Sequence, residues 1–262
     1  MFPPNLADRL HVGIIMDGNG RWAVAHGMSR YEGHRMGAKI VRQIVRVAPD
    51  CGVRTLTLYA FSSENWNRPP DEVSVLMSLF DRYLRREAVE CASEGVQISV
   101  LGRRDRFSNR LRSAIDEAEH MTKGGDRLHL RIALDYSSRD TILMAALQLA
   151  SSTEKTPNLF SSLIAGTDTD GTPVSDVDLI IRTGGEQRLS DFLLWECAYA
   201  ELLFTDTMWP EFDEHEFRRA IEEFHSRDRR FGRVPNAVER NRTGNRYDAS
   251  PRETSRRQKS PA

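Results

Sequence analysis

The chain carries its most distinctive chemistry near the N-terminus, in the run Asp17-Gly18-Asn19-Gly20-Arg21-Trp22. The two glycines let the backbone approach a ligand closely, and a helix that starts there offers free N–H groups to an anion. A carboxylate can hold a hard cation and a guanidinium can hold phosphate oxygens. The run therefore favours binding of a metal-bound diphosphate. A glycine turn that merely precedes a helix is the structural alternative.

Two further sets of basic side chains have the same character. Two arginines and a serine surround a Gly-Gly turn in Arg182-Thr183-Gly184-Gly185-Glu186-Gln187-Arg188-Leu189-Ser190. The planar fork of arginine matches phosphate oxygens, so this turn predicts a second anion clamp. Arg30 and His34 lie four positions apart and would share one face of a helix. Surface arginines at a turn and a solvated basic helix face are the alternatives.

A third polar segment is Ser62-Ser63-Glu64-Asn65-Trp66-Asn67-Arg68. It follows an apolar stretch typical of a strand, and we expect it to contribute to a site. A hydrogen-bonded loop with Trp66 as a hydrophobic plug is the alternative. Glu201 precedes the predicted strand 202–205; a lone carboxylate there is usually structural, but it can also join Asp17 around a hard cation.

The elements that position these segments follow from hydrophobic patterning. Apolar strand-like stretches at 11–16, 53–61, 96–101, 128–134, 177–181 and 202–205 alternate with helical stretches at 34–50, 71–94, 106–122, 138–151 and 213–230. This alternation predicts an α/β fold with a mostly parallel central sheet of about six strands covered by helices. Ligands bind such sheets at the carboxyl ends of the strands. The polar segment 151–176 is expected to be a surface excursion.

Composition excludes several classes of protein. The 262 residues include 37 basic and 38 acidic side chains, and this balance argues against a nucleic-acid-binding protein. No apolar run is long enough to span a membrane. The three cysteines form no CxxC pair, which argues against a zinc knuckle or a disulfide framework. A soluble cytoplasmic protein is therefore predicted.

The C-terminus differs from the rest of the chain. Residues 233–262 contain eight basic and three acidic side chains and few apolar ones. Such a segment cannot bury enough surface to offset its ordering entropy. We predict one catalytic domain at 1–232 and a disordered basic tail at 233–262. The tail is either a solvated end without a role or a weak contact with an anionic membrane surface.

Several long motifs, in a consistent order, resemble the signatures of cis-prenyltransferases, the bacterial undecaprenyl diphosphate synthases above all. They are His11–Trp22, Gly33-His34, Tyr59–Pro69, Ile181–Ser190, Ala198–Leu202, Trp209-Pro210 and Arg229–Gly232. The resemblance covers roughly residues 11–232. It implies a homodimeric, Mg²⁺-dependent enzyme with a hydrophobic tunnel, which adds isopentenyl diphosphate to an allylic diphosphate, such as farnesyl or geranyl diphosphate, with cis double bonds.

The resemblance also implies roles for individual residues. Asp17 resembles the essential metal-binding aspartate, and Asn65 a residue that takes part in proton removal. Glu201 resembles a second metal carboxylate, supplied by the partner subunit or lying near the interface. Arg230 and Gly232 resemble an element that completes the partner subunit's site. The implied substrate-binding residues are Gly18, Asn19, Gly20, Arg21, Trp22, Arg30, His34, Ser62, Ser63, Glu64, Trp66, Arg68, Arg182, Arg188, Leu189 and Ser190.

The sequence alone leaves the chain length of the product undecided. One tunnel wall is expected on the helix from Val73 to Ala92, from its side chains Val73, Leu76, Met77, Phe80, Tyr83 and Leu84. Ala60 is small where a bulky residue would shorten the tunnel, which favours a long, undecaprenyl-like product. Departures from the family pattern at Asp135–Arg139 and at Gly102-Arg103 keep a short-chain product, made for a specialised isoprenoid pathway, as the rival hypothesis.

Two alternatives belong to other classes of protein. A non-catalytic partner subunit of the same family would lose the aspartate and the first arginine, whereas this chain keeps Asp17 and Arg21. Gly18, Gly20 and Ala23 also fit a dinucleotide-binding fingerprint. A dinucleotide site needs an acidic residue at the end of the second strand to hold a ribose. That strand ends in Tyr59-Ala60-Phe61-Ser62, so an oxidoreductase is disfavoured.

Overall fold

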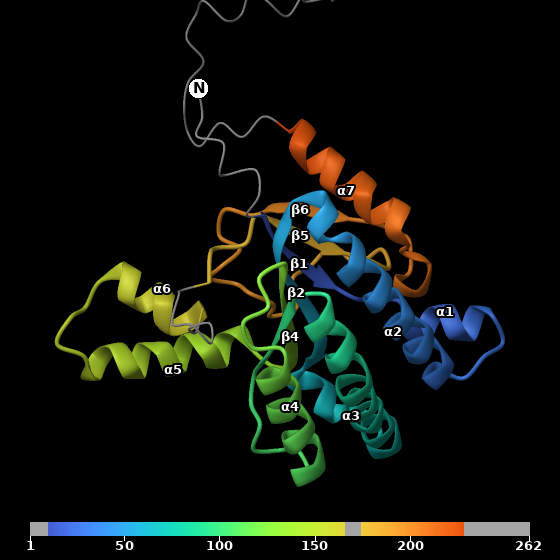
Figure 1. The fold of residues 1–262 in the computed structure, drawn as a ribbon, viewed down its shortest axis with the longest axis horizontal. Helices are drawn as coiled ribbons and strands as arrows, with labels where there is room; N and C mark the ends of the chain where they lie inside the picture. Colours follow the sequence, from blue (N-terminus) through green and yellow to red (C-terminus); the bar gives the residue numbers. More distant parts are fainter. Residues whose placement is uncertain (1–9, 166–173, 228–262) are drawn as a thin grey trace, which may run out of the picture. The chain divides into compact units, whose positions relative to one another are not determined.

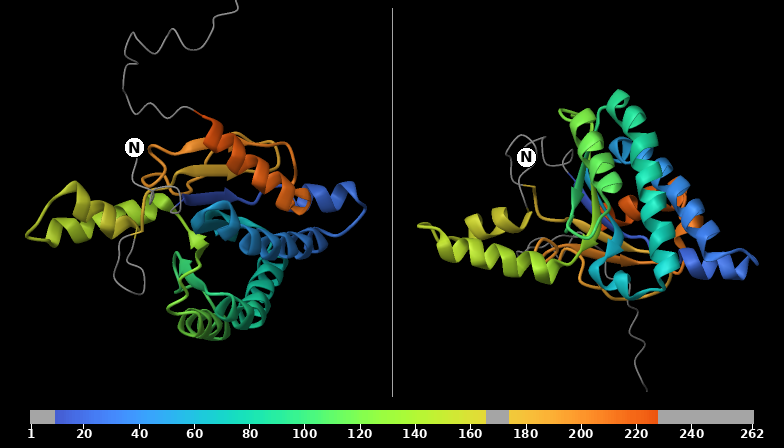
Figure 2. Two further views of the ribbon diagram at one scale, coloured as in Figure 1. Left: turned by 45° about the horizontal axis from the view of Figure 1, so that its top comes forward. Right: turned by 90° about the horizontal axis from the view of Figure 1, so that it is seen from below.

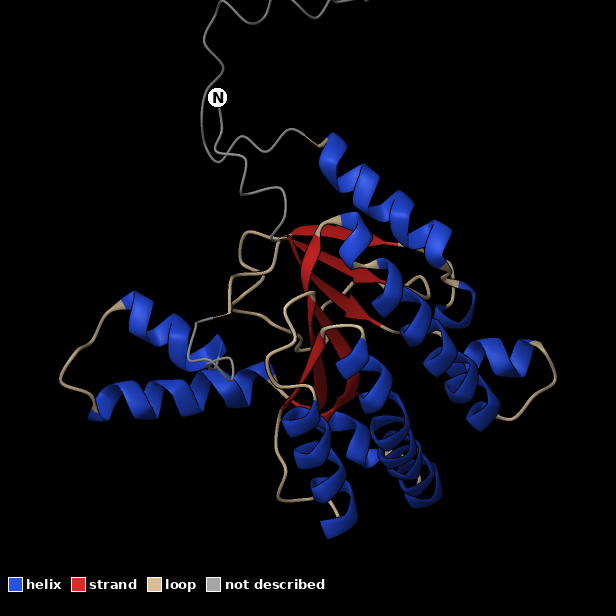
Figure 3. Ribbon diagram, in the orientation of Figure 1, coloured by secondary structure: helices blue, strands red, loops and turns tan. Residues whose placement is uncertain are grey.

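A six-stranded parallel sheet forms the centre of the fold (Figure 3). The computed structural model describes residues 10–165 and 174–227, and all the elements below belong to the unit of residues 1–226. The strand order is β3-β4-β2-β1-β5-β6, and every pair is parallel. The strands are β1 (Leu10–Ile15), β2 (Val53–Ser62), β3 (Val96–Leu101), β4 (Leu128–Tyr136), β5 (Leu179–Arg182) and β6 (Glu201–Phe204). The prediction of an α/β fold with about six parallel strands is confirmed.

One face of the sheet is covered by four long helices, which Figure 1 shows packed side by side. They are α2 (Arg30–Val47), α3 (Pro70–Ser93), α4 (Asn109–Met121) and α7 (Glu214–Ser226). Their starts have local causes: the Ser29 hydroxyl accepts from the Glu32 amide, and the Ser108 hydroxyl from the Leu111 amide. The short α1 (Asn19–Ala25) precedes α2 and packs against it. Apolar side chains of these helices and the strands form the main core.

The other face carries a smaller core and the helix pair α5 (Ser138–Ser151) and α6 (Pro157–Ala165). Figure 2 shows this pair on the side of the sheet opposite α2 and α3. The segment 151–176, expected to be a polar surface excursion, contains the helix α6, which the sequence analysis did not predict. Its run Asn158-Leu159-Phe160-Ser161-Ser162-Leu163-Ile164-Ala165 follows a proline at the first helical position and packs Phe160 against Trp195.

Three 3₁₀ turns complete the described residues: η1 (Pro49–Cys51), η2 (Ser63–Asn67) and η3 (Trp209–Glu211). Helix α2 begins four residues before the predicted stretch 34–50, because its cap is Ser29. None of the helices in residues 10–165 and 174–227 is long and apolar enough to cross a membrane. Cys51, Cys91 and Cys197 are free cysteines. The tail 233–262 lies outside the described residues.

Candidate active site

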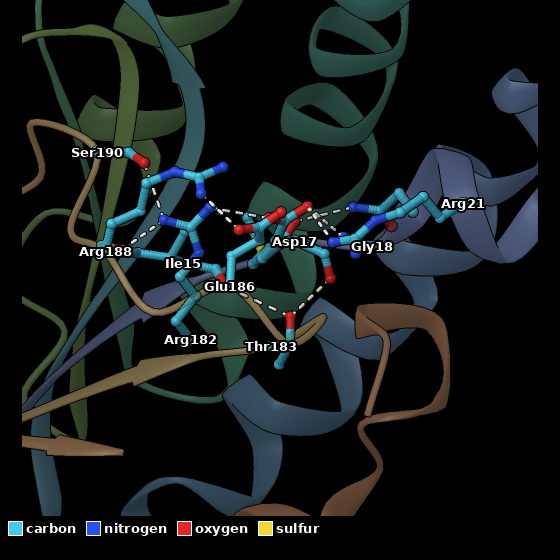
Figure 4. A network of polar contacts seen from close by, with 11 residues as sticks. Ile15, Asp17, Gly18, Arg21, Arg182, Thr183, Glu186, Arg188 and Ser190 are labelled. Atoms are coloured by element: carbon cyan, nitrogen blue, oxygen red, sulfur yellow. Dashed lines mark hydrogen bonds and ion pairs between the residues drawn. The ribbon is translucent and has the colours of Figure 1, made fainter. Parts of the chain in front are cut away.

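The carboxylate of Asp17 lies at the centre of the polar site (Figure 4). The neighbouring strands β1 and β5 end side by side, so Asp17 meets Arg182 across the sheet. Arg182 Nη2 donates to Asp17 Oδ2 at 2.9 Å, and the Gly18 amide donates to Asp17 Oδ1 at 2.6 Å. Arg21 Nη2 lies 3.2 Å from the same Oδ1. The segments Asp17–Trp22 and Arg182–Ser190 therefore form one site.

The electrostatics of this cluster keep Asp17 ionised. Burial alone would raise the pKa of the Asp17 carboxyl, but the hydrogen bond from Arg182, the Gly18 amide and the charge of Arg21 together hold that pKa below its ordinary value. The Asp17 side chain is still 30% exposed, so its oxygens face the solvent-accessible site. An ionised, partly exposed carboxylate among arginines can bind a cation and a phosphate together.

The turn after β5 is organised by Arg182, whose side chain is nearly buried. Arg182 Nη1 donates to the Ser190 hydroxyl at 2.8 Å and to the Arg188 carbonyl. Gly184 has a φ of +82°, and a Cβ there would lie 2.8 Å from Arg21 Nη2. A side chain at Gly184 would thus collide with the arginine beside Asp17. Arg188 itself is exposed and pairs with Glu186 at the edge of the site.

A second basic cluster gathers Arg30, His34 and Arg68 around Glu72. Arg30 Nε lies 3.4 Å and Arg68 Nη1 3.1 Å from the Glu72 carboxylate. A Cβ at Gly20 would lie 2.8 Å from Arg30 Cζ, so the glycine makes room for this guanidinium. Sequence reasoning missed Glu72; its signal was the spacing of four residues from Arg68 at the start of α3.

His34 is half-buried and neutral. Burial, and next the charge of Arg68, lower the pKa of His34 to about 4. The His34 Nε2 atom is buried and has no hydrogen-bond partner among the described residues. Because this nitrogen belongs to a residue that lines the cavity described below, it is available to a ligand there.

The η2 turn holds Asn65 by a reciprocal cap. The Ser62 amide donates to Asn65 Oδ1 at 3.2 Å, and the Ser62 hydroxyl accepts from the Asn65 amide. Ser63 donates to the buried Asp135 carboxylate at 3.1 Å. Trp66 packs edge-on against Phe61, with ring centroids 5.5 Å apart. The turn therefore presents Asn65 while Trp66 acts as an apolar anchor.

A cavity of about 450 Å³ joins these groups to the interior between α2, α3 and the sheet. Its polar lining includes the predicted site residues Asp17, Asn19, His34, Ser62, Asn65, Arg68, Arg182, Arg188 and Ser190. Beyond Ala60 the lining is largely apolar, with Val41, Leu58, Leu76, Leu79, Phe80, Leu84, Ile98, Val100, Leu130, Ile132 and Leu134. Of the six side chains expected on α3, Leu76, Phe80, Tyr83 and Leu84 line the cavity, and Val73 and Met77 do not.

A set of ion pairs joins α2 to α3 along the same cavity lining. Arg42 and Arg46 both pair with Glu90, and they lie 3.4 Å and 3.5 Å from Glu87 and Glu94, respectively. All five of these charged residues line the cavity, as does Cys91. Burial raises the pKa of the Cys91 thiol to about 11. The apolar space is therefore bordered by charges at two places, the Asp17 region and this α2–α3 contact.

Other predicted residues lie apart from the cavity. Within the described ranges, the predicted site residues outside its lining are Gly18, Gly20, Arg21, Trp22, Arg30, Ser63, Glu64, Trp66, Leu189 and Glu201. Trp22 is buried and donates to Glu211 at 2.8 Å, and Leu189 packs into the smaller core. Gly18 caps α1 in the left-handed conformation. Arg230 and Gly232 lie outside the described residues.

Glu201 does not join Asp17 within one chain. It is the first residue of β6 and is level with Leu179 of β5, which in turn is level with Val12 of β1. Asp17 follows β1 at the opposite end of the sheet, five residues after Val12, or roughly 16 Å at the usual strand rise. The local hypothesis that the two carboxylates share a cation in the same subunit is wrong. No group of three His, Cys, Asp or Glu side chains suited to a metal occurs in residues 10–165 and 174–227.

Comparison with known proteins agrees with this geometry. Residues 15–232 match the family described as putative undecaprenyl diphosphate synthase. Isoprenyl transferase 1 of Bradyrhizobium diazoefficiens is 54% identical over 86% of this chain and 90% of its own length. The ditrans,polycis-undecaprenyl-diphosphate synthase ((2E,6E)-farnesyl-diphosphate specific) of Escherichia coli is 46% identical over 85% and 89% of the two chains.

A solved structure supports the same conclusion. Lavandulyl diphosphate synthase from Lavandula x intermedia, in complex with dimethylallyl diphosphate, superposes with a TM-score of 0.78 and 32% identity, over 85% of this chain and 98% of that one. The parallel sheet and these similarities thus define a cis-prenyltransferase. The chain belongs to the undecaprenyl diphosphate synthase family and is a prenyltransferase.

Proposed function

We propose that the protein condenses isopentenyl diphosphate with an allylic diphosphate, farnesyl or geranyl diphosphate, to give a long cis-polyprenyl diphosphate. One observation carries the proposal: a single cavity runs from the arginines and Asp17 into an apolar space between α2, α3 and the sheet. A diphosphate with a long hydrocarbon chain has the same division into a charged head and an apolar body. Such a ligand matches the cavity in both parts.

The two basic clusters suit two diphosphates. The allylic diphosphate is assigned to Arg30, His34 and Arg68, together with the backbone and side chains of 18–21. Isopentenyl diphosphate is assigned to Arg182, Arg188 and Ser190. Asp17 contacts Arg21 and Arg182 and so lies between the two clusters. Holding two substrates in this way removes much of the entropic barrier to their reaction.

Asp17 fits an Mg²⁺ ion. It is an ionised, partly exposed carboxylate at a site for phosphates, and Mg²⁺ is usually held by one or two carboxylates with phosphate oxygens of the substrate. When bound, the ion neutralises charge that develops on the departing diphosphate. Glu201 of a second subunit is the further carboxylate proposed for the ion.

The residues of the chain supply the rest of the chemistry. As the allylic carbon–oxygen bond breaks, negative charge grows on the leaving diphosphate, and the preorganised arginines stabilise it. A carbon–carbon bond forms to isopentenyl diphosphate, and one proton leaves. Asn65, which its own turn holds in place, orients the group that loses this proton. The apolar lining keeps water from the reactive intermediate.

A long product is favoured by the small side chain of Ala60 and by the apolar lining beyond it. The Escherichia coli relative is named an undecaprenyl-diphosphate synthase. The short-chain hypothesis is kept as the second candidate, because the named structural neighbour makes lavandulyl diphosphate. In both cases this cavity would serve as the tunnel for the growing chain.

Product analysis tests the proposal. The full chain is incubated with Mg²⁺, labelled isopentenyl diphosphate and, separately, dimethylallyl, geranyl or farnesyl diphosphate, and the products are sized by chromatography. A long ladder from farnesyl or geranyl diphosphate supports the proposal. A single short product supports the second candidate. Folded protein that incorporates no label with any primer contradicts both.

We further propose a homodimer. Large apolar side chains are exposed on α5, at Leu143, Met144 and Leu147, and close to Glu201, at Trp195, Tyr199 and Leu202. Exposed apolar surface of this extent fits a partner subunit. Glu201, Arg230 and Gly232 would then complete the partner's site, as the family resemblance implies. The cytoplasmic location and a weak membrane-surface contact of the tail stay predictions.

A further inference from the structure

The structure assigns positioning roles to Arg106 and Asp135: the pair holds the η2 turn, and through it Asn65, at the mouth of the cavity. Neither residue is among the predicted site residues, and neither lines the cavity within the described ranges. The inference rests on the role proposed for Asn65, and the experiment below separates the two.

Asp135 is the first of the two residues that hold the η2 turn. It lies near the end of β4, is fully buried, and has a φ of +54°. The left-handed region is disfavoured for residues other than glycine, and Asp and Asn tolerate it best. Such strain persists only where surrounding contacts enforce it, and it concentrates at functional sites. The contacts here are those of its carboxylate.

That carboxylate is shared between two partners. Arg106 Nε donates to Asp135 Oδ2 at 2.8 Å, and Arg106 Nη2 donates to Oδ1. The Ser63 hydroxyl donates to the same Oδ1 at 3.1 Å. Because Arg106 binds with both prongs of its fork, the carboxylate has a fixed orientation. Ser63, the first residue of η2, is thereby tied to β4.

Arg106 makes a second contact with the same turn. Its Cζ lies 5.1 Å from the centroid of the Trp66 ring, within the range of a cation–π interaction. Arg106 belongs to the loop between β3 and α4, and the Arg103 amide of this loop donates to the Asp135 carbonyl at 3.1 Å. The turn is thus held in place by contacts at Ser63 and at Trp66, and Asn65 lies between these two residues.

Loss of this support should slow the reaction and leave the proposed isopentenyl diphosphate clamp intact. The two charges of the pair compensate each other, and Arg106 is committed to Asp135 and Trp66. Removing its fork should let η2 shift, and small misplacements of a catalytic group can cost about 100-fold in rate. Binding of isopentenyl diphosphate by Arg182 and Arg188, which lie outside this turn, should be unaffected.

The experiment compares Arg106→Gln with a matched control, Arg110→Gln. Arg110 also donates to a buried carboxylate, from Nε to Asp81 Oδ2 at 2.9 Å, but this pair joins α4 to α3 away from the turn. Both variants should lose thermal stability. We expect kcat to fall roughly 10- to 100-fold in Arg106→Gln only, with the KM for isopentenyl diphosphate changed less than about twofold.

Two further variants keep the test decisive. Arg106→Lys retains the charge without the planar guanidinium and should recover only part of kcat. If Arg106→Gln alone is unstable, the double variant Arg106→Gln with Asp135→Asn replaces it, because it leaves no buried unpaired charge. In an Asn65→Ala background, Arg106→Gln should cost little more, because the two act as one unit.

Equal kcat in the folded Arg106 and Arg110 variants overturns the inference. A full additional loss in the Asn65→Ala background also overturns it, because Arg106 would then act by another route. A normal kcat in Asn65→Ala alone contradicts the role proposed for Asn65, whatever Arg106→Gln does. Lack of polyprenyl product from the unmodified protein contradicts the proposed function instead.

Discussion

Asp17 and Arg182 are 165 positions apart in the sequence, yet Arg182 Nη2 and Asp17 Oδ2 lie 2.9 Å apart. The contact exists because β1 and β5 are neighbours in the sheet and end at the same edge. It places a carboxylate beside a nearly buried guanidinium, so each fixes the other's orientation. This fixed arrangement suits the binding of a cation and a phosphate that we propose for the site.

Replacing Asp17 should remove almost all turnover. Asp17→Ala deletes the carboxylate proposed for Mg²⁺, and we expect kcat/KM to fall roughly 1,000-fold or more. The fold should persist, because the side chain is partly exposed and belongs to no core cluster. Steady-state kinetics with circular dichroism checks both statements. Asp50→Ala, which removes an exposed carboxylate paired with Arg127, is the control. Near-normal turnover in Asp17→Ala would overturn the site assignment.

Enlarging Ala60 should shorten the product. Ala60 lines the cavity on β2, so Ala60→Leu places three more carbon atoms in its apolar part. The product distribution should move to shorter chains, while consumption of the first isopentenyl diphosphate continues. Chromatographic sizing of the products measures this. Ala92→Leu, on the exposed face of α3, is the control and should leave the distribution unchanged. An unaltered distribution in Ala60→Leu would mean that the chain grows elsewhere.

Two histidines, the buried His11 and the half-buried His34, should make the fold sensitive to acid. Burial, and next the charge of Arg131, lower the pKa of His11 to about 3, and the pKa of His34 is about 4, against 6.5 for an ordinary histidine. At a pH between the lowered pKa of each histidine and the ordinary value of 6.5, the unfolded chain binds more protons than the folded one. The free energy of unfolding is therefore unaffected above the ordinary pKa and should fall as the pH drops below it. The expected slope is about 1.4 kcal/mol per pH unit for each histidine.

Urea denaturation at about pH 7.5 and about pH 5.5 measures this effect. His11→Asn should be less stable at the higher pH, because His11 contacts Thr57 Oγ1 and the Ser175 carbonyl, each at 2.8 Å. It should also show a shallower loss of stability on acidification than the unmodified protein. His215→Asn, at an exposed position, should leave the slope as it is. A His11→Asn slope equal to that of the unmodified protein would show that His11 takes up its proton normally.

Charge introduced on α5 should dissociate the proposed dimer. Leu147 is 57% exposed, and in Leu147→Glu a buried interface would have to accept an unpaired carboxylate. Sedimentation should then report one copy instead of two. Activity should fall with it, because the partner's Glu201 would be lost from the site. Val89→Glu, at an exposed position of α3, is the control. If the unmodified protein sediments as a single copy and is active, the dimer is wrong.

The sequence by itself determined the class of fold and singled out the polar segments proposed for the site. Strand β3 begins and ends where its alternation of apolar and polar residues does, from Val96 to Leu101, because it is an edge strand that buries alternate side chains. The proposed clamp residues stand out in the sequence because arginines flank a glycine turn, a combination that suits binding of an anion. Helix α6 is not predicted by the sequence pattern, because its short apolar run lies among polar residues.

Only the tertiary structure decided which of these groups meet. The register of the strands unites Asp17 with Arg182 and places Glu201 at the opposite end of the sheet, because strand order is fixed by long-range pairing. The same holds for Arg106, Asp135 and Trp66, which come from three segments and show no shared motif. A local sequence pattern can predict a charged turn. The residues that contact and orient this turn depend on which segments the folded chain brings together.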